Sequence, residues 1–238
     1  MLSASFLCMS TRLANVVVDA ADPSALARFW AELLDWRVTG GSTVQAPPDD
    51  GCELALVFTP ASGEKVRKNR VHLDLSSAAP DQQMVIMRRA LALGASRVDV
   101  GQRNVPWFVL ADPEGNEFCV LEPRPEYSAT GALAAVVVDA VDPAVLAQFW
   151  SAATGWPQVT SSAKTASLRA PHGRGPWLEF VWTGEPHESP NRVRVELAPG
   201  EDRAAEVAHL VELGGRRIDG GVMADPEGNE FRVLEPRD

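Results

Sequence analysis

Apolar residues recur at helical spacing directly after two Asp-Pro pairs. An Asp side chain can cap the free N–H groups of a helix, and Pro is tolerated at the first helical position. A helix is therefore predicted to begin at Asp22 and Pro23, and its apolar face comprises Leu26, Phe29, Trp30, Leu33 and Leu34. A second helix of the same kind follows Asp142 and Pro143 and ends near Gly155.

Two more helices and several strands complete the pattern. One helix follows Pro80 and ends at Gly94, and another runs from about residue 202 to residue 213. Strands show alternation with a period of two. In the segment "VHLDL", His72 and Asp74 face away from the set Val71, Leu73 and Leu75. We expect the apolar sets to pack on the helices and the opposite faces to line a cavity.

The chain repeats itself. "VVVDAADPSALARFW" from residue 16 recurs as "VVVDAVDPAVLAQFW" from residue 136, and "NRVHLDL" from residue 69 recurs as "NRVRVEL" from residue 191. "ADPEGNEFCVLEPR" from residue 111 recurs as "ADPEGNEFRVLEPR" from residue 224, and the only change is Cys119 against Arg232. A period this long indicates a duplicated domain rather than a solenoid.

The repeat sets the expected domain organisation. We predict a disordered lead over 1–10, a first domain over 11–126, a linker over 127–131 and a second domain over 132–238. Each half-domain has the order strand, helix, then several strands. The prediction is an α+β fold with four such modules.

Composition narrows the choice of partners. The chain has 238 residues and a formal net charge of −10. Such an acidic chain repels phosphate backbones and anionic lipid, so we expect no nucleic-acid or membrane partner. No apolar run reaches the ~20 residues that a membrane helix needs. Three cysteines without a pairing pattern indicate reduced thiols in a cytoplasmic protein.

These repeated motifs together resemble the vicinal oxygen chelate superfamily, which includes glyoxalase I, extradiol dioxygenases and bleomycin-resistance proteins. The resemblance covers nearly the whole chain, twice. It implies βαβββ modules paired in two glyoxalase-like domains, with cupped mixed sheets and the helices outside. In the enzymes of this superfamily the cup holds a divalent metal, so zinc, iron, manganese or nickel becomes a candidate cofactor. One fold hosts many functions, however, and the motifs do not define a reaction.

The resemblance also implies where metal ligands would stand, on four strands of each copy. In the first copy these positions are Asn15, Val57, His72 and Cys119. In the second copy they are Ala135, Glu179, Arg194 and Arg232. Metal-binding members usually have His or Glu there, so we favour a cup without metal.

Two pairings of the modules give different cups. If the two modules of one domain pair, neither cup holds a convincing metal set. If modules pair across domains, one cup gains Arg194 and Arg232, which suit an anionic ligand. The other cup then gains His72, Glu179 and Cys119, three side chains able to bind zinc or iron. Alternatively, His72 is a hydrogen-bonded cavity histidine, Cys119 is a small apolar residue, and Arg232 pairs with a local carboxylate.

Aromatic residues suggest a ligand. Seven tryptophans stand against one tyrosine. Trp107, Trp177 and Trp182 lie in strands that should form a cup, where flat apolar rings can stack on a planar ligand.

Three functions are consistent with the sequence. The first is a protein that binds a small planar or hydrophobic molecule, including an anionic one, for resistance or sequestration. Its ligand-binding residues would be His72, Asp74, Trp107, Cys119, Trp177, Glu179, Arg194 and Arg232. The second is a lyase, isomerase or dioxygenase with metal at His72, Glu179 and Cys119. The third is a structural protein with closed cups. The chain would act either as a monomer that is itself a fused pseudo-dimer or as a homodimer.

Overall fold

A computed structural model describes residues 11–61, 63–102 and 104–236 of the chain. The expected lead over 1–10 lies outside the described residues. Four βαβββ modules follow one another, as the repeats predict. Module 1 holds β1 (Arg12–Ala20), α1 (Pro23–Leu34), β2 (Arg37–Thr39), β3 (Thr43–Gln45) and β4 (Ala55–Pro60). Module 2 holds β5 (Val71–Leu75), α2 (Pro80–Ala92), β6 (Ser96–Arg97), β7 (Phe108–Ala111) and β8 (Glu117–Val120).

The second half repeats this order after a short 3₁₀ helix, η1 (Pro125–Tyr127). Module 3 holds β9 (Leu133–Ala140), α3 (Pro143–Thr154), β10 (Gln158–Ser161), β11 (Thr165–Leu168) and β12 (Trp177–Trp182). Module 4 holds β13 (Val193–Ala198), α4 (Arg203–Glu212), β14 (Arg216–Arg217), β15 (Val222–Ala224) and β16 (Glu230–Val233). No helix of the described ranges has the length and apolar character to cross a membrane.

Helix caps explain where the helices begin. The Asp22 carboxylate accepts a hydrogen bond from the Ala25 backbone N–H at 2.9 Å, and Asp142 and Asp202 cap α3 and α4 in the same way. Every apolar residue predicted for the first helix is buried in α1. The α+β class, the module order and the capping residues are therefore confirmed.

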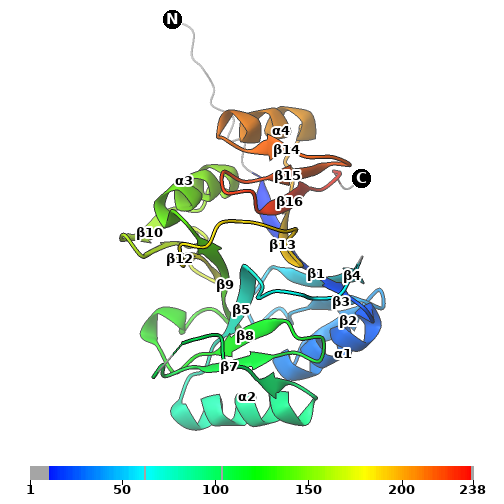
Figure 1. Cartoon of the computed structure of the whole chain (residues 1–238), viewed down its shortest axis with the longest axis vertical. Helices are drawn as coiled ribbons and strands as arrows, with labels where there is room; N and C mark the ends of the chain where they lie inside the picture. The colour runs from blue at the N-terminus through cyan, green and yellow to red at the C-terminus, as the bar shows by residue number, and fades with distance from the viewer. Residues whose placement is uncertain (1–10, 62, 103, 237–238) are drawn as a thin grey trace, which may run out of the picture.

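Modules pair across the two domains. Sheet A has the strand order β14-β15-β16-β13-β1-β4-β3-β2, and sheet B has the order β10-β11-β12-β9-β5-β8-β7-β6. Sheet A thus joins modules 1 and 4, and sheet B joins modules 2 and 3 (Figure 1). The joining seams are antiparallel, β1 with β13 and β5 with β9. The first alternative from the sequence, in which the two modules of one domain pair with each other, is therefore wrong.

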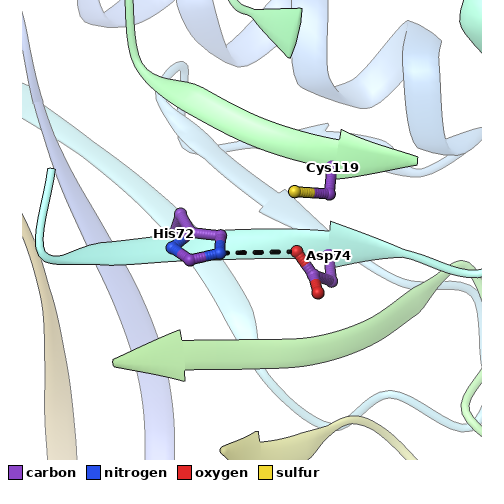
Figure 2. Close-up of side chains that lie close together, drawn as sticks. All are labelled: His72, Asp74 and Cys119. Carbon is purple, nitrogen blue, oxygen red and sulfur yellow. Dashed lines mark ion pairs between the residues drawn. The ribbon is translucent and has the colours of Figure 1, made fainter. Parts of the chain in front are cut away.

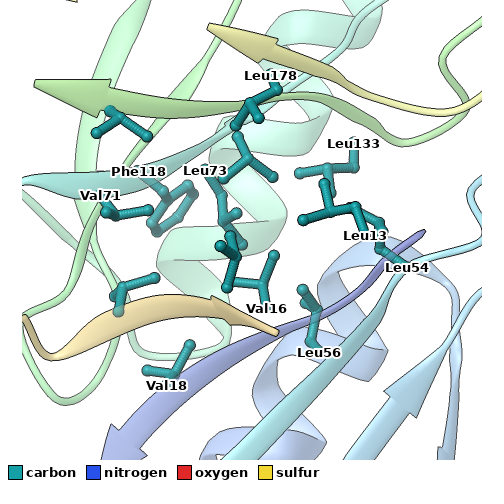
Figure 3. Close-up of a cluster of buried hydrophobic side chains, with 14 of the residues drawn as sticks. Leu13, Val16, Val18, Leu54, Leu56, Val71, Leu73, Phe118, Leu133 and Leu178 are labelled. Carbon is teal, nitrogen blue, oxygen red and sulfur yellow. The ribbon is translucent and has the colours of Figure 1, made fainter. Parts of the chain in front are cut away.

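One continuous apolar core lies on the helix-covered faces of both sheets. Figure 3 shows Val16 of β1 and Leu56 of β4 in one cluster with Leu73 of β5 and Phe118 of β8. The helix-free faces of the two sheets lie on the opposite side of the strands from this core. We call them cup A, on sheet A, and cup B, on sheet B.

Two glutamates of the repeated DPEGNEF turns tie the domains together. Glu114 accepts hydrogen bonds from the backbone N–H groups of Ala21 and Asp22, at 2.7 and 2.9 Å, and pairs with Arg192 at 2.9 Å. Glu227 makes the equivalent contacts in the other half and pairs with Arg70 at 2.9 Å. Each glutamate thus joins the start of a helix in its own domain to an arginine of the other domain.

Replacing Glu114 by Ala should lower the free energy of unfolding by about 2–4 kcal/mol, because it leaves two N–H groups and a largely buried guanidinium without their acceptor. Urea denaturation measures the change. Glu64→Ala is the matched control, since Glu64 is exposed on the loop between β4 and β5. Equal stability of the two variants would contradict the role given to Glu114.

Candidate functional site

Strand register shows which residues of the two cups are equivalent. Val17 of β1 lies between Val57 and Arg194, and Val137 of β9 lies between Glu179 and His72. In the strand register, Glu196 lies opposite Arg232, as Asp74 lies opposite Cys119. The cross-domain cups therefore have the composition expected from the second alternative. Arg194 and Arg232 stand in cup A, and His72, Glu179 and Cys119 stand in cup B.

In cup A one of the two arginines is neutralised within the sheet. The Arg194 guanidinium binds Asp19 Oδ1 at 2.8 Å, and the same oxygen accepts a hydrogen bond from Thr59 at 2.9 Å. Asn15 Nδ2 donates to Glu196 Oε2 at 2.8 Å. Of the two arginines expected to hold an anionic ligand, Arg194 is thus engaged by a carboxylate, whereas Arg232 is exposed and has no ion-pair partner among the described residues.

Cup B holds a compact cluster of polar side chains, which we call the HDC cluster: His72, Asp74 and Cys119. One ligand atom from each residue lies within 4.8 Å of the other two (Figure 2). His72 Nε2 is 3.6 Å from Asp74 Oδ1, too far for a hydrogen bond. Among the described residues, His72 Nδ1 and Asp74 Oδ1 are buried without a hydrogen-bond partner. Unpaired buried polar atoms of this kind point to a water, an ion or a ligand.

A difference in ion pairing leaves His72 available. Asp19 and Asp139 are equivalent, but Asp19 pairs with Arg194 whereas Asp139 pairs with Lys68 from the loop before β5. In cup B, therefore, Lys68 supplies the positive charge that Arg194 supplies in cup A. The strand position equivalent to Arg194 holds His72, whose imidazole is neutral.

Burial controls the protonation of the HDC cluster. Loss of hydration lowers the pKa of His72 to about 3, with a further contribution from the Lys68 charge. Loss of hydration and the Glu179 carboxylate raise the pKa of Asp74 to about 7. Burial, together with Asp74, also raises the pKa of the Cys119 thiol. The thiol therefore stays protonated and is a poor nucleophile, whereas Asp74 is suited to proton transfer near neutral pH.

Glu179 does not join the HDC cluster, because the inter-domain segment holds it. The hydroxyl of Tyr127 donates a hydrogen bond to Glu179 Oε1 at 3.0 Å. Trp177 Nε1 and the Arg169 guanidinium donate to backbone carbonyls of the same segment, at 3.2 and 3.3 Å. Residues 124–131, which we call the strap, therefore cover one end of cup B. Of the metal set expected from the sequence, the structure brings His72 and Cys119 together, with Asp74 in the third place.

Aromatic rings form the walls of cup B. Trp107 and Trp177 pack, partly exposed, against a buried group that contains Cys119 and Tyr127. The Arg124 guanidinium lies over the rings of Trp107 and Tyr127, 5.5 and 5.7 Å from their centroids. Trp182 instead belongs to the alternating set of β12 that faces the helices, and its side chain is 49% exposed at the strand end.

Sequence reasoning missed two residues of cup B, Tyr127 and Arg124. Arg124 forms an ion pair with Glu122 at 2.6 Å. Its contact with the aromatic wall was not expected. Tyr127 is the only tyrosine of the chain, but it lies in the predicted linker, where no periodicity indicates the direction of a side chain.

Two grooves lie outside the cups. One of about 540 Å³ is bounded by the loops before β5 and β13. Every cation of its wall already has an acidic or carbonyl partner, for example Lys65 with Glu117 and Arg67 with Glu188. The other, of about 950 Å³, lies between the C-terminal end of α1, helix α2 and the outer side of the strap. Of the five buried polar side-chain atoms that lack a partner among the described residues, His72 Nδ1 and Asp74 Oδ1 lie together in cup B, whereas Arg192 Nε borders the first groove.

The raised pKa of Asp74 predicts a pH-dependent stability. An unfolded Asp ionises near pH 4, whereas folded Asp74 ionises near pH 7. Between these values the unfolded chain loses a proton that the folded chain keeps, so stability falls as pH rises. Chelator-treated wild type should therefore lose on the order of 3 kcal/mol relative to Asp74→Asn between pH 4 and pH 7. Denaturation at several pH values measures this, and a pH-independent difference would contradict it.

Comparisons with known proteins agree with this geometry. The family model described as "Glyoxalase-like domain" matches residues 15–121 and again residues 135–234. Glyoxalase I from Zea mays has a similar structure, with a TM-score of 0.66, 15% sequence identity, and coverage of 93% of this chain and 91% of that chain. A glyoxalase/bleomycin resistance protein from Albidiferax ferrireducens covers 47% of this chain, and 98% of its own length, at 20% identity and a TM-score of 0.36.

No curated protein matches the sequence significantly. At 15% identity the likeness to the maize enzyme shows the fold alone. The family model, in contrast, covers most of the chain in two copies. The chain belongs to the glyoxalase-like domain family, within the vicinal oxygen chelate superfamily, and carries two copies of the domain in tandem.

Proposed function

We propose that the protein binds a small planar or hydrophobic molecule in cup B and does so without metal. The observation that carries this proposal is the combination of partly exposed tryptophan rings with buried, unpaired polar atoms in one cup. Ligand sites generally pair apolar walls with a few polar groups that fix orientation. Cup A offers neither, because none of the buried unpaired atoms of the described residues lies on a strand of sheet A and Ala55 stands where cup B has Trp177.

The same residues suggest how a ligand would be held. Trp107 and Trp177 supply flat apolar surface, and burying such surface contributes roughly 25 cal/mol per Å². The HDC cluster supplies the polar end. The strap covers the cup from one side, so a ligand would enter over His72 and Glu179, which keep some exposure. Both cups are complete within one chain, so neither needs a second copy.

Binding should depend on Trp177. Replacing Trp177 by Ala is expected to weaken binding of planar aromatic compounds about tenfold or more, through loss of stacking area. Tryptophan fluorescence quenching across a library of aromatic compounds, followed by calorimetry, measures this.

Trp182→Ala is the matched control, since Trp182 lies on the same strand but on its other face. It should bind as wild type does. If no compound in the library binds, or if both variants lose affinity equally, the assignment of cup B as the binding site fails.

A metal-dependent enzyme is the second candidate, and the HDC cluster favours it specifically. Bond lengths of about 2.0–2.3 Å place tetrahedral zinc ligands roughly 3.3–3.8 Å apart. The distance of 3.6 Å between His72 Nε2 and Asp74 Oδ1 already has this size. The two buried atoms without a hydrogen-bond partner, His72 Nδ1 and Asp74 Oδ1, belong to residues that can bind a metal. His, Asp and Cys thus fit zinc or iron, with an open position for substrate. A bound ion would act as a Lewis acid that polarises a substrate oxygen, and Glu179, which stands outside the HDC cluster, would accept or donate a proton of the substrate.

Elemental analysis tests this candidate. Protein purified without chelator should carry about one zinc, iron, manganese or nickel per chain if the site binds metal, and His72→Ala should lose it. His209→Ala is the control, because His209 lies partly exposed on α4, outside cup B. If the wild-type protein carries no metal, or if His72→Ala keeps its metal, the metal-dependent enzyme is ruled out.

A further inference from the structure

Cup B has an excess of hydrogen-bond acceptors over donors. In the part of the chain that the structure describes, its unpaired buried atoms are Asp74 Oδ1, Glu122 Oε2 and His72 Nδ1. Both carboxylate oxygens can only accept when ionised. Asp74 is 9% exposed, and its side chain lies beside those of His72 and Cys119 (Figure 2). A ligand that satisfies these atoms has to bring donors.

The charges of cup B lead to the same conclusion. Three of its carboxylates have a cation: Glu117 pairs with Lys65, Asp139 with Lys68, and Glu122 with Arg124. Each of these cations is therefore already used. Asp74 and Glu179 have no cationic partner among the described residues: the imidazole beside Asp74 is neutral, and Glu179 receives only the neutral hydroxyl of Tyr127. When ionised, these two carboxylates are the uncompensated ones of the cup.

Cup A shows what compensation looks like at the same positions. Glu196, the equivalent of Asp74, accepts from Asn15 at 2.8 Å and lies opposite the cationic Arg232 in the strand register, where Asp74 lies opposite Cys119. The equivalent of Glu179 is the apolar Val57. Cup A thus has one carboxylate fewer at these positions and a cation beside the one that it has. The same backbone therefore carries a compensated cup and an uncompensated one.

We propose that cup B selects a small organic cation: a planar or apolar body that carries a protonated amine. This rests on the proposed metal-free binding function and names its ligand class. The ammonium group donates to Asp74 and Glu179, and the body packs against Trp107 and Trp177. The anionic ligand considered from the sequence depended on Arg194 and Arg232, which stand in cup A.

A matched set of probes tests the proposal. Naphthylmethylamine, naphthylmethanol and naphthoate share one ring system and differ in charge. Calorimetry on chelator-treated protein should show the amine binding about tenfold to hundredfold more tightly than the alcohol, because a charge-assisted hydrogen bond replaces a neutral one. Naphthoate should bind least, since it meets two carboxylates.

Variants locate the preference. In Asp74→Asn the ratio of amine to alcohol affinity should fall to roughly a tenth of its wild-type value or less, and Glu179→Gln should lower it in the same direction. Glu196→Gln changes the equivalent residue of cup A and should leave the ratio unchanged. Thermal unfolding of each variant verifies that it is folded.

The outcomes separate this inference from the function on which it rests. If the alcohol or naphthoate binds as tightly as the amine, or if Asp74→Asn keeps the preference, the cation proposal is overturned while small-molecule binding stands. If none of the three probes binds, planar-ligand binding in cup B and the cation proposal both fall.

Discussion

The antiparallel seams between β1 and β13 and between β5 and β9 are the constraint on which the rest of this structure depends. Each seam joins a strand of the first domain to a strand of the second. It therefore decides which four modules share a sheet, and with that which side chains share a cup. The reciprocal pairs of Glu114 with Arg192 and Glu227 with Arg70 reinforce the same arrangement. Without the seams, His72 and Glu179 would belong to different cups.

Duplication followed by divergence gives the two cups opposite electrostatics on one backbone. In cup A, Arg194 neutralises Asp19, and Asn15 satisfies Glu196. In cup B, Lys68 takes over the pairing with the equivalent aspartate, which leaves His72 neutral beside an uncompensated Asp74. Buried charges without partners cost stability. Cup B carries this cost at Asp74 and Glu179, and the proposed ligand would offset it.

The strap adds a second asymmetry. Tyr127 reaches cup B because the inter-domain segment directly follows β8 of the same sheet. Its hydroxyl holds Glu179 away from His72, Asp74 and Cys119, and its ring packs edge-on against Trp177 at 6.5 Å. The connection between the domains thus also forms one wall of the candidate site, and this makes cup B narrower at that end.

The sequence by itself determined the local structure. Asp-Pro caps, helical and alternating periodicities and the repeated turns define the modules, because these signals depend only on neighbouring residues. Alternation also placed His72 and Asp74 on one face of their strand. Only the tertiary structure decided which modules pair, since both pairings bury the same apolar faces. It also decided the contacts of long side chains, such as Arg194 with Asp19 and Tyr127 with Glu179. These contacts join residues far apart in the chain, and no local pattern specifies them.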